Sequence, residues 1–121
     1  MTRLRVIKAF DGVSIAAHEL RKVPNASKRV LFSHATGFHG LVFNQTMQAL
    51  STDHDVHCMS IDHRGHGLTK YINNANGKDT WEMFGDDALA ASHVLMKDCN
   101  QGDTTLIGTA HAIKLITYSC I

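Results

Sequence analysis

The sequence has little of the residues and patterns that mark a special environment. Its 121 residues include one proline and three cysteines, and Cys58, Cys99 and Cys120 show no C-x-x-C spacing. An odd number of widely spaced cysteines argues against a disulfide framework and a zinc ribbon, so a reducing cytoplasm is the expected location. No apolar run reaches about 18 residues, which argues against a membrane-spanning helix. The first residues alternate charged with apolar side chains, unlike a signal peptide.

An excess of charge of one sign is also missing. Twelve Lys and Arg residues stand against eleven Asp and Glu residues, and no block of five or more like charges occurs. We therefore expect neither nucleic acid nor a membrane as a partner. What the chain does contain is 44% apolar residues, enough for a buried core. Its length fits one domain, residues 1–121.

The apolar pattern predicts strands that alternate with helices. Asp11-Gly12 between two β-rich runs predicts an antiparallel hairpin with strands at about 3–10 and 13–20. Further strands are expected at 29–34, 55–62 and 104–108, and helices at 41–50 and 81–98. This order predicts an α/β fold in which an N-terminal antiparallel hairpin leads to a mainly parallel sheet of about five strands with flanking helices.

Spacings of three and four residues define an apolar face on each expected helix. On the first helix this face holds Val42, Met47 and Leu50. Thr80 or Asp79 is expected to cap the second helix, with Asp86 and Asp87 on its solvated face and Cys58 in the core of the fold. The apolar face of the second helix holds Trp81, Phe84, Ala88, Leu89, Ala91 and Leu95.

Two glycine-containing loops follow predicted strands. The loop SHATGFHG at 33–40 leaves backbone N–H groups at the carboxyl edge of the sheet, where ligands of open α/β sheets bind. These groups could form a hole for an anion or an oxyanion, or the segment could simply be a tight turn. The loop IDHRGHGLT at 61–69 places Arg64 where it can bind Asp62 or nearby carbonyl groups, as a structural latch.

Nine histidines make a metal site a second interpretation. His63 and His66, with His57 or His54 nearby, could offer two or three imidazoles. No cysteine or acid completes a familiar ligand spacing, and each histidine fits a surface or hydrogen-bonded position. We therefore expect no metal and no cofactor.

Together, at this separation, the two loops resemble those of the α/β-hydrolase superfamily. They are similar to the branch with an H-G-x-P-like oxyanion loop and a D-x-R-G-x-G-x-S loop, here residues 34–37 and 62–69. The resemblance covers residues 3–108 and implies the strand order 1-2-4-3-5 and a small-molecule substrate with an ester, amide or related bond. It implies oxyanion N–H donors at Thr36 and His111. The structural positions that it implies are His34, Gly37, Asp62, Arg64, Gly65 and Gly67.

The sequence departs from this family at the nucleophile elbow. Where the family has G-x-S-x-G after the fifth strand, this chain has Gly108-Thr109-Ala110-His111-Ala112. A methyl group cannot attack a carbonyl, so no acyl-enzyme can form at Ala110. Ser119 and Cys120 lie further along the chain, with no base positioned beside them by any motif. The acid and the histidine of the family follow later strands. The resemblance therefore implies that residues 1–121 are the N-terminal portion of an α/β-hydrolase domain, and we expect a truncated or degenerate copy without turnover.

Two functional hypotheses follow. In the first, the chain is an incomplete copy of a hydrolase of small ester-, amide- or related-bond substrates. In the second, it is a non-catalytic α/β-hydrolase-like module that binds a ligand or a partner. In both cases the fifth strand, TTLIG, is expected at the edge of the sheet, where unpaired backbone groups favour self-association.

Overall fold

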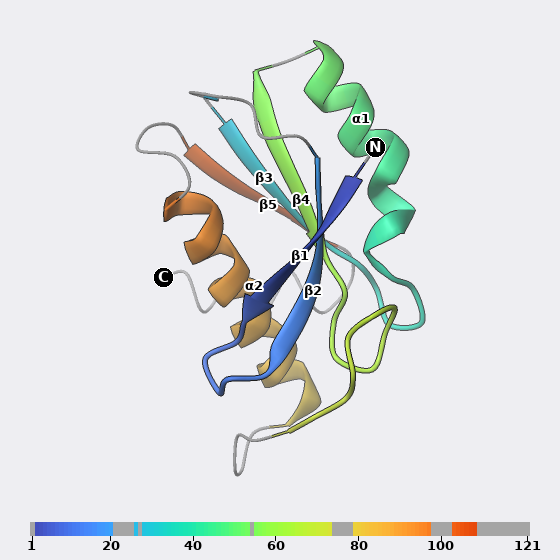
Figure 1. Ribbon diagram of the computed structural model, residues 1–121, viewed down its shortest axis with the longest axis vertical. Coiled ribbons are helices and arrows are strands. Elements are labelled where there is room, and N and C mark those ends of the chain that lie inside the picture. Colours follow the sequence, from blue (N-terminus) through green and yellow to red (C-terminus); the bar gives the residue numbers. More distant parts are fainter. Residues whose placement is uncertain are drawn as a thin grey trace.

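The structure, a computed structural model, describes residues 2–20, 26, 28–53, 55–73, 79–97 and 103–108, the last segment by its backbone alone. Strands and helices alternate as the sequence predicts, with ends that shift by up to three residues. In chain order they are β1 (Thr2–Lys8), β2 (Ser14–Leu20), β3 (Lys28–Ser33), the 3-10 helix η1 (Gly40–Phe43), α1 (Asn44–Asp53), β4 (Val56–Ile61), α2 (Thr80–Lys97) and β5 (Asp103–Gly108) (Figure 1).

The described strands form one sheet with the order β1-β2-β4-β3-β5, which confirms the expected topology. β2 pairs antiparallel with both β1 and β4, while β3 pairs parallel with β4 and β5. α1 covers one face of this sheet and α2 covers the other (Figure 1). No helix in the described part of the chain is long and apolar enough to cross a membrane.

The hairpin between β1 and β2 is wider than the Asp-Gly pair predicts. Regular pairing ends at Lys8 and Ser14. The connection is closed by the N–H of Ala9, which donates to the carbonyl of Val13 over 2.9 Å. Gly12 adopts φ +85°, which only glycine adopts without strain. In this wider connection the carboxylate of Asp11 accepts hydrogen bonds from Arg64 of the candidate site.

Two apolar cores lie on opposite faces of the sheet. Successive residues of β3 point to opposite faces, so Leu31 packs on the α2 side while Val30 and Phe32 pack on the α1 side. This arrangement confirms that β3 is covered on both faces. The core on the α2 side contains Ile7, Ala9, Val13, Ile15, Ala17, Leu31, Met59, Ile61, Ala88, Ala91 and Leu95. The core on the α1 side contains Leu20, Val30, Phe32, Met47, Val56 and Cys58.

The helices follow their predicted faces in part. Met47, Phe84 and Leu95 are buried as expected, and the carboxylate of Asp79 caps α2 by accepting the N–H of Glu82 over 2.8 Å. Val42 and Trp81, which were expected in the core, remain 47% and 40% exposed. Both lie near the start of a helix, in η1 and in α2.

Candidate functional site

Three strands end at the same level on the carboxyl edge of the sheet. Ser33, the last residue of β3, pairs with Ile61 of β4 on one side and with Gly108 of β5 on the other. Ligands of open α/β sheets bind outside this edge, where the connections leave the strands. The loops that begin at His34 and at Asp62 therefore form the candidate site.

The first loop contains a tight turn, residues 35–38, that exposes its backbone. The N–H of Phe38 donates to the carbonyl of Ala35 over 3.0 Å, and Gly37 has φ +89°. A positive φ at the third position is the mark of a type II turn, which explains why glycine stands there. Thr36, the predicted oxyanion donor, occupies the exposed second position of this turn.

His34 joins this turn to the second loop through both of its ring nitrogens. Its Nε2 accepts the backbone N–H of His63 over 3.0 Å, so the ring proton is on Nδ1. This Nδ1–H donates to the carbonyl of Ala35 over 2.7 Å. The ring is 1% exposed, and burial lowers the pKa of His34 below its ordinary value. At neutral pH His34 is therefore a neutral connector between the two loops.

Asp62 fixes the far end of the first loop. Its buried carboxylate accepts the N–H of Gly40 over 2.7 Å, the N–H of Leu68 over 3.0 Å and the Nε2–H of His18 over 3.0 Å. Burial alone would raise the pKa of Asp62, but these donors hold it below its ordinary value. Gly67 has φ +52°, and a Cβ there would collide with the carboxylate of Asp62, so both its conformation and its space require glycine.

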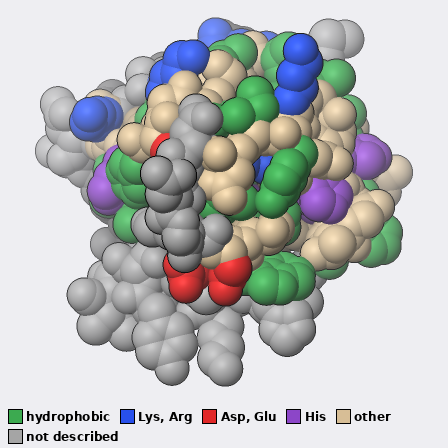
Figure 2. Space-filling model, turned by 90° about the horizontal axis from the view of Figure 1, so that it is seen from below, with side chains coloured by type: hydrophobic (Ala, Val, Ile, Leu, Met, Phe, Trp, Pro, Cys, Tyr) green, Lys and Arg blue, Asp and Glu red, His purple; other side chains and the backbone are tan. Residues whose placement is uncertain are grey.

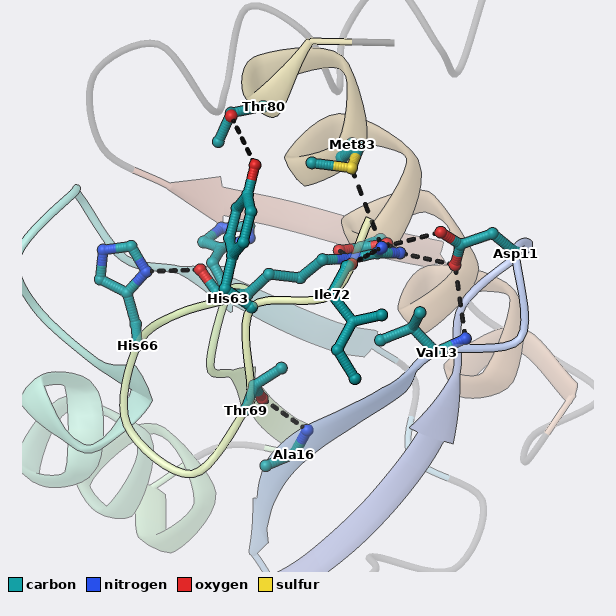
Figure 3. Close-up of polar contacts among 12 residues, drawn as sticks. Asp11, Val13, Ala16, His63, His66, Thr69, Ile72, Thr80 and Met83 are labelled. Carbon is teal, nitrogen blue, oxygen red and sulfur yellow. Dashed lines mark hydrogen bonds and ion pairs between the residues drawn. The ribbon is translucent and has the colours of Figure 1, made fainter. Parts of the chain in front are cut away.

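Arg64 is the centre of a buried ion-pair network that joins three parts of the chain. Its guanidinium binds Asp87 of α2 through two contacts of 2.7 and 2.8 Å, and it binds Asp11 of the hairpin through two contacts of 2.7 Å. It also donates to the carbonyl of Ile72 and lies 3.8 Å from the sulfur of Met83 (Figure 3). Bidentate pairing, in which two N–H groups of one guanidinium donate to one carboxylate, is a strong form of the arginine–carboxylate interaction.

This network bears out one expectation for Arg64 and corrects two others. Arg64 binds a nearby carbonyl, that of Ile72, as expected of a structural latch. Its carboxylate partners among the described residues are Asp11 and Asp87, and Asp62 is not one of them. Asp87 is 1% exposed, whereas the sequence pattern placed it on a solvated helix face. Burial raises the pKa of Asp87 even though the guanidinium of Arg64 acts in the opposite direction. The charge of Arg64 explains why a carboxylate can lie on the buried side of α2.

A serine–histidine pair lies beneath these loops, and sequence reasoning did not predict it. Ser33 Oγ is 2.6 Å from His63 Nε2, and both residues are 1% exposed. The ring of His63 packs against Phe84 of α2, and Nδ1 of His63 has no hydrogen-bond partner among the described residues. Burial lowers the pKa of His63 to about 3. So weak a base at neutral pH is poorly suited to activate the Ser33 hydroxyl.

Hydrophobic and histidine side chains surround this edge. His66 is partly buried, and its Nδ1–H donates to the carbonyl of Arg64 over 2.9 Å. Viewed from below, this end of the molecule shows histidines beside hydrophobic side chains, with acidic side chains gathered at one border (Figure 2). The exposed large hydrophobic residues of the two loops and of the start of η1 and α2 are Phe38, Leu41, Val42, Leu68, Tyr71, Ile72 and Trp81.

The proposed metal ligands do not all lie together among the described residues. His57 belongs to a different cluster, where its Nε2 lies 3.2 Å from the buried carboxylate of Glu19. Burial would raise the pKa of Glu19, but His57, Arg3 and Arg5 together lower it to about 2. In the part of the chain that the structure describes, no three His, Cys, Asp or Glu side chains are placed to hold a metal ion. His54, the other proposed ligand, lies outside the described residues.

The predicted nucleophile elbow begins at Gly108, the last residue that the structure describes. Gly108 closes β5 at the carboxyl edge, beside Ser33. Ala110, His111 and Ala112 lie outside the described residues, as do Ser119 and Cys120. The meeting of the Thr36 and His111 amides at one oxyanion position therefore stays a prediction.

Comparison with known proteins gives a likeness in structure alone. No protein family and no curated protein matches the sequence. Epoxide hydrolase A from Mycobacterium thermoresistibile superposes with a TM-score of 0.73 at 17% identity, over 100% of this chain and 35% of that one. Epoxide hydrolase VrEH1 from Vigna radiata gives a TM-score of 0.74 at 20% identity, over 98% of this chain and 35% of that one. For the Pyrococcus furiosus esterase Pf2001 the TM-score is 0.68 at 14% identity, over 92% of this chain and 43% of that one.

The chain therefore spans about a third of the length of the epoxide hydrolases that it matches. The strand order, the parallel register at the carboxyl edge and these superpositions agree on one architecture. The protein has a partial α/β-hydrolase fold.

Proposed function

We propose that the chain comes from a lineage of hydrolases that act on small esters, amides or related bonds, and that it has lost turnover by the triad mechanism. The observation that carries this proposal is Ala110, which stands two residues after the end of β5, where the lineage has its nucleophile. Without a hydroxyl or a thiol at this position, no covalent intermediate can form there.

The geometry of the carboxyl edge supports descent from an active hydrolase. The 35–38 turn presents backbone amides at the edge of the sheet, as an oxyanion loop would. The solved structures that it resembles are named as epoxide hydrolases and an esterase, names that indicate epoxide and ester substrates for those proteins. These features favour a small-molecule ligand with a polarised carbon–oxygen bond.

The Ser33–His63 pair does not replace the lost nucleophile in this proposal. Both side chains are buried, and an imidazole with a pKa of about 3 removes a hydroxyl proton poorly at neutral pH. A Ser33→Ala variant keeps the volume of the site and removes the hydroxyl. It is therefore the control for any residual activity.

The test is hydrolysis of a 4-nitrophenyl ester and of an aryl epoxide by mass-verified protein. We expect no saturable turnover of either compound. The proposal is wrong if saturable hydrolysis appears and a Thr36→Pro variant abolishes it. Proline is favoured at the second position of a type II turn, so Thr36→Pro deletes the N–H group without opposing the 35–38 turn. Thr36→Ser keeps the N–H group and is the matched control.

The alternative function is a non-catalytic module that binds a ligand or a partner. It is favoured by the way Asp62, Arg64 and His34 hold the two loops in place through buried polar contacts. A retained binding role predicts soluble protein that unfolds cooperatively. Aggregation of the purified chain, or dependence on a chaperone, would instead favour a degenerate copy.

A further inference from the structure

His34 uses each ring nitrogen for a different backbone partner. Nδ1–H donates to the carbonyl of Ala35, at the start of the 35–38 turn. Nε2 accepts the N–H of His63, the second residue after β4. The neutral ring therefore acts as donor and acceptor at once, and it bridges the two loops of the candidate site.

A proton on this ring removes the bridge. The imidazolium donates from both nitrogens, so its Nε2–H would point at the N–H of His63. The new charge would also lie in a site where the ring is 1% exposed. The contact with Ala35 survives protonation, while the contact with His63 cannot.

The surroundings of His34 give the cation little support. Among the described side chains, the charged or titratable groups that face it are His39 on its own loop and Asp62, His63 and His66 on the second loop. Asp62 is the one anion among them. Its carboxylate is already occupied by Gly40, Leu68 and His18. From α2, Phe84 packs against His63 and His66 and carries no charge.

The far end of the first loop is held in a different way. Gly40 donates its N–H to the carboxylate of Asp62, and the same carboxylate accepts the N–H of Leu68. These contacts need an ionised carboxylate, and the pKa of Asp62 is below its ordinary value. Mild acid that protonates His34 therefore leaves this second anchor in place.

We propose that His34 is a pH-sensitive joint, whose protonation separates the 35–38 turn from His63 while Asp62 keeps Gly40 anchored. Mild acid then frees one end of the predicted oxyanion loop without unfolding the sheet. This inference depends on the His34 and Asp62 contacts and does not depend on whether the protein turns over a substrate.

The test is hydrogen exchange of single backbone amides by NMR, on the full chain, at about pH 7.5 and at about pH 5. After correction for intrinsic exchange, the His63 amide should lose protection by about tenfold for each pH unit below the pKa of a free histidine. The amides of Gly40 and Leu68, which donate to the ionised carboxylate of Asp62, should lose less protection than the His63 amide over the same range.

Two variants separate this joint from general acid sensitivity. His34→Gln keeps an oxygen acceptor and does not titrate, so it should remove the pH dependence of the His63 amide. His93→Gln removes an exposed histidine of α2 that is not among the groups facing His34, and it should leave that dependence unchanged. The proposal fails if the three amides lose protection in parallel, or if protection of the His63 amide does not change with pH. The wild-type comparison decides the matter even if His34→Gln does not fold.

Discussion

Replacing Asp87 by alanine removes one of the two carboxylates that hold the Arg64 guanidinium. The side chains of Arg64 and Asp87 are 2% and 1% exposed, so water cannot take the place of the lost carboxylate. Removing one partner of a buried ion pair costs about 3–5 kcal/mol, because the other charge stays buried without compensation. For a domain whose free energy of unfolding is typically about 5–15 kcal/mol, this is a large fraction.

The partner on the other side of Arg64 should matter less. The side chain of Asp11 is 14% exposed, so water can solvate part of the guanidinium after Asp11→Ala. We expect a loss of about 1.5–3 kcal/mol, the range for hydrogen bonds to charged groups. Arg64→Met combined with Asp87→Leu should be more stable than Asp87→Ala alone, because it leaves no buried guanidinium without its carboxylate. The carboxylate of Asp11, which loses Arg64 in this double variant, is 14% exposed and stays partly solvated.

Urea unfolding, followed by circular dichroism and by the fluorescence of Trp81, the single tryptophan, measures these differences. Glu82→Gln on the exposed side of α2 is the matched control and should change the free energy of unfolding by less than about 0.5 kcal/mol. A loss below about 1 kcal/mol for Asp87→Ala would show that Arg64 does not depend on this carboxylate. A larger loss for Asp11→Ala than for Asp87→Ala would show that burial does not decide which partner matters more.

Three further predictions concern stability and association. The pKa values of His34 and His63 are lowered in the fold, so the unfolded chain binds more protons and stability falls as the pH drops below about 6.5. The free energy of unfolding should fall by up to about 2.7 kcal/mol per pH unit while both histidines contribute. A free energy of unfolding that does not change between about pH 6.5 and 5 would contradict this prediction. Gly67→Ala should lower the free energy of unfolding by more than about 2 kcal/mol, because it adds a collision with Asp62 to the strain at φ +52°. Gly12→Ala has open space around its new Cβ and should show the backbone strain alone. Equal losses of stability for the two variants in thermal unfolding would contradict this. β5 has one neighbour among the described strands, so we expect concentration-dependent self-association in sedimentation, reduced by Thr105→Lys; a monomer at all concentrations would exclude it.

The local spacing of apolar residues was enough to predict the strands and helices of this fold. The strand and helix positions follow from spacings of two and of three to four residues, which each segment carries within itself. The order of the sheet came instead from the resemblance of two loops to a family. Val42 and Trp81 fit the helical pattern and are exposed all the same, because periodicity shows which residues share a helix face and not how much of that face is covered.

The candidate site was predictable only in outline. The spacing of the glycines indicated where the loops at His34 and Asp62 begin, but not which atoms join them. Arg64 binds Asp11 and Asp87, which lie 53 and 23 residues away in the sequence. No local sequence pattern distinguishes these two acids from the acids that remain in solvent. The hydrogen bond from the His63 amide to His34 could not be predicted from the sequence either, because it depends on β3 and β4 ending side by side.

In the proposed function the chain carries no nucleophile at the end of β5, because Ala110 stands where the lineage has one. Labelling of the wild-type protein with a fluorophosphonate, followed by mapping of any adduct by mass spectrometry, is the decisive experiment. We expect no adduct at residues 108–112, whereas Ala110→Ser provides the hydroxyl that the wild-type protein lacks at position 110. A stoichiometric adduct on Thr109 of the wild-type protein would show that the end of β5 does carry a nucleophile.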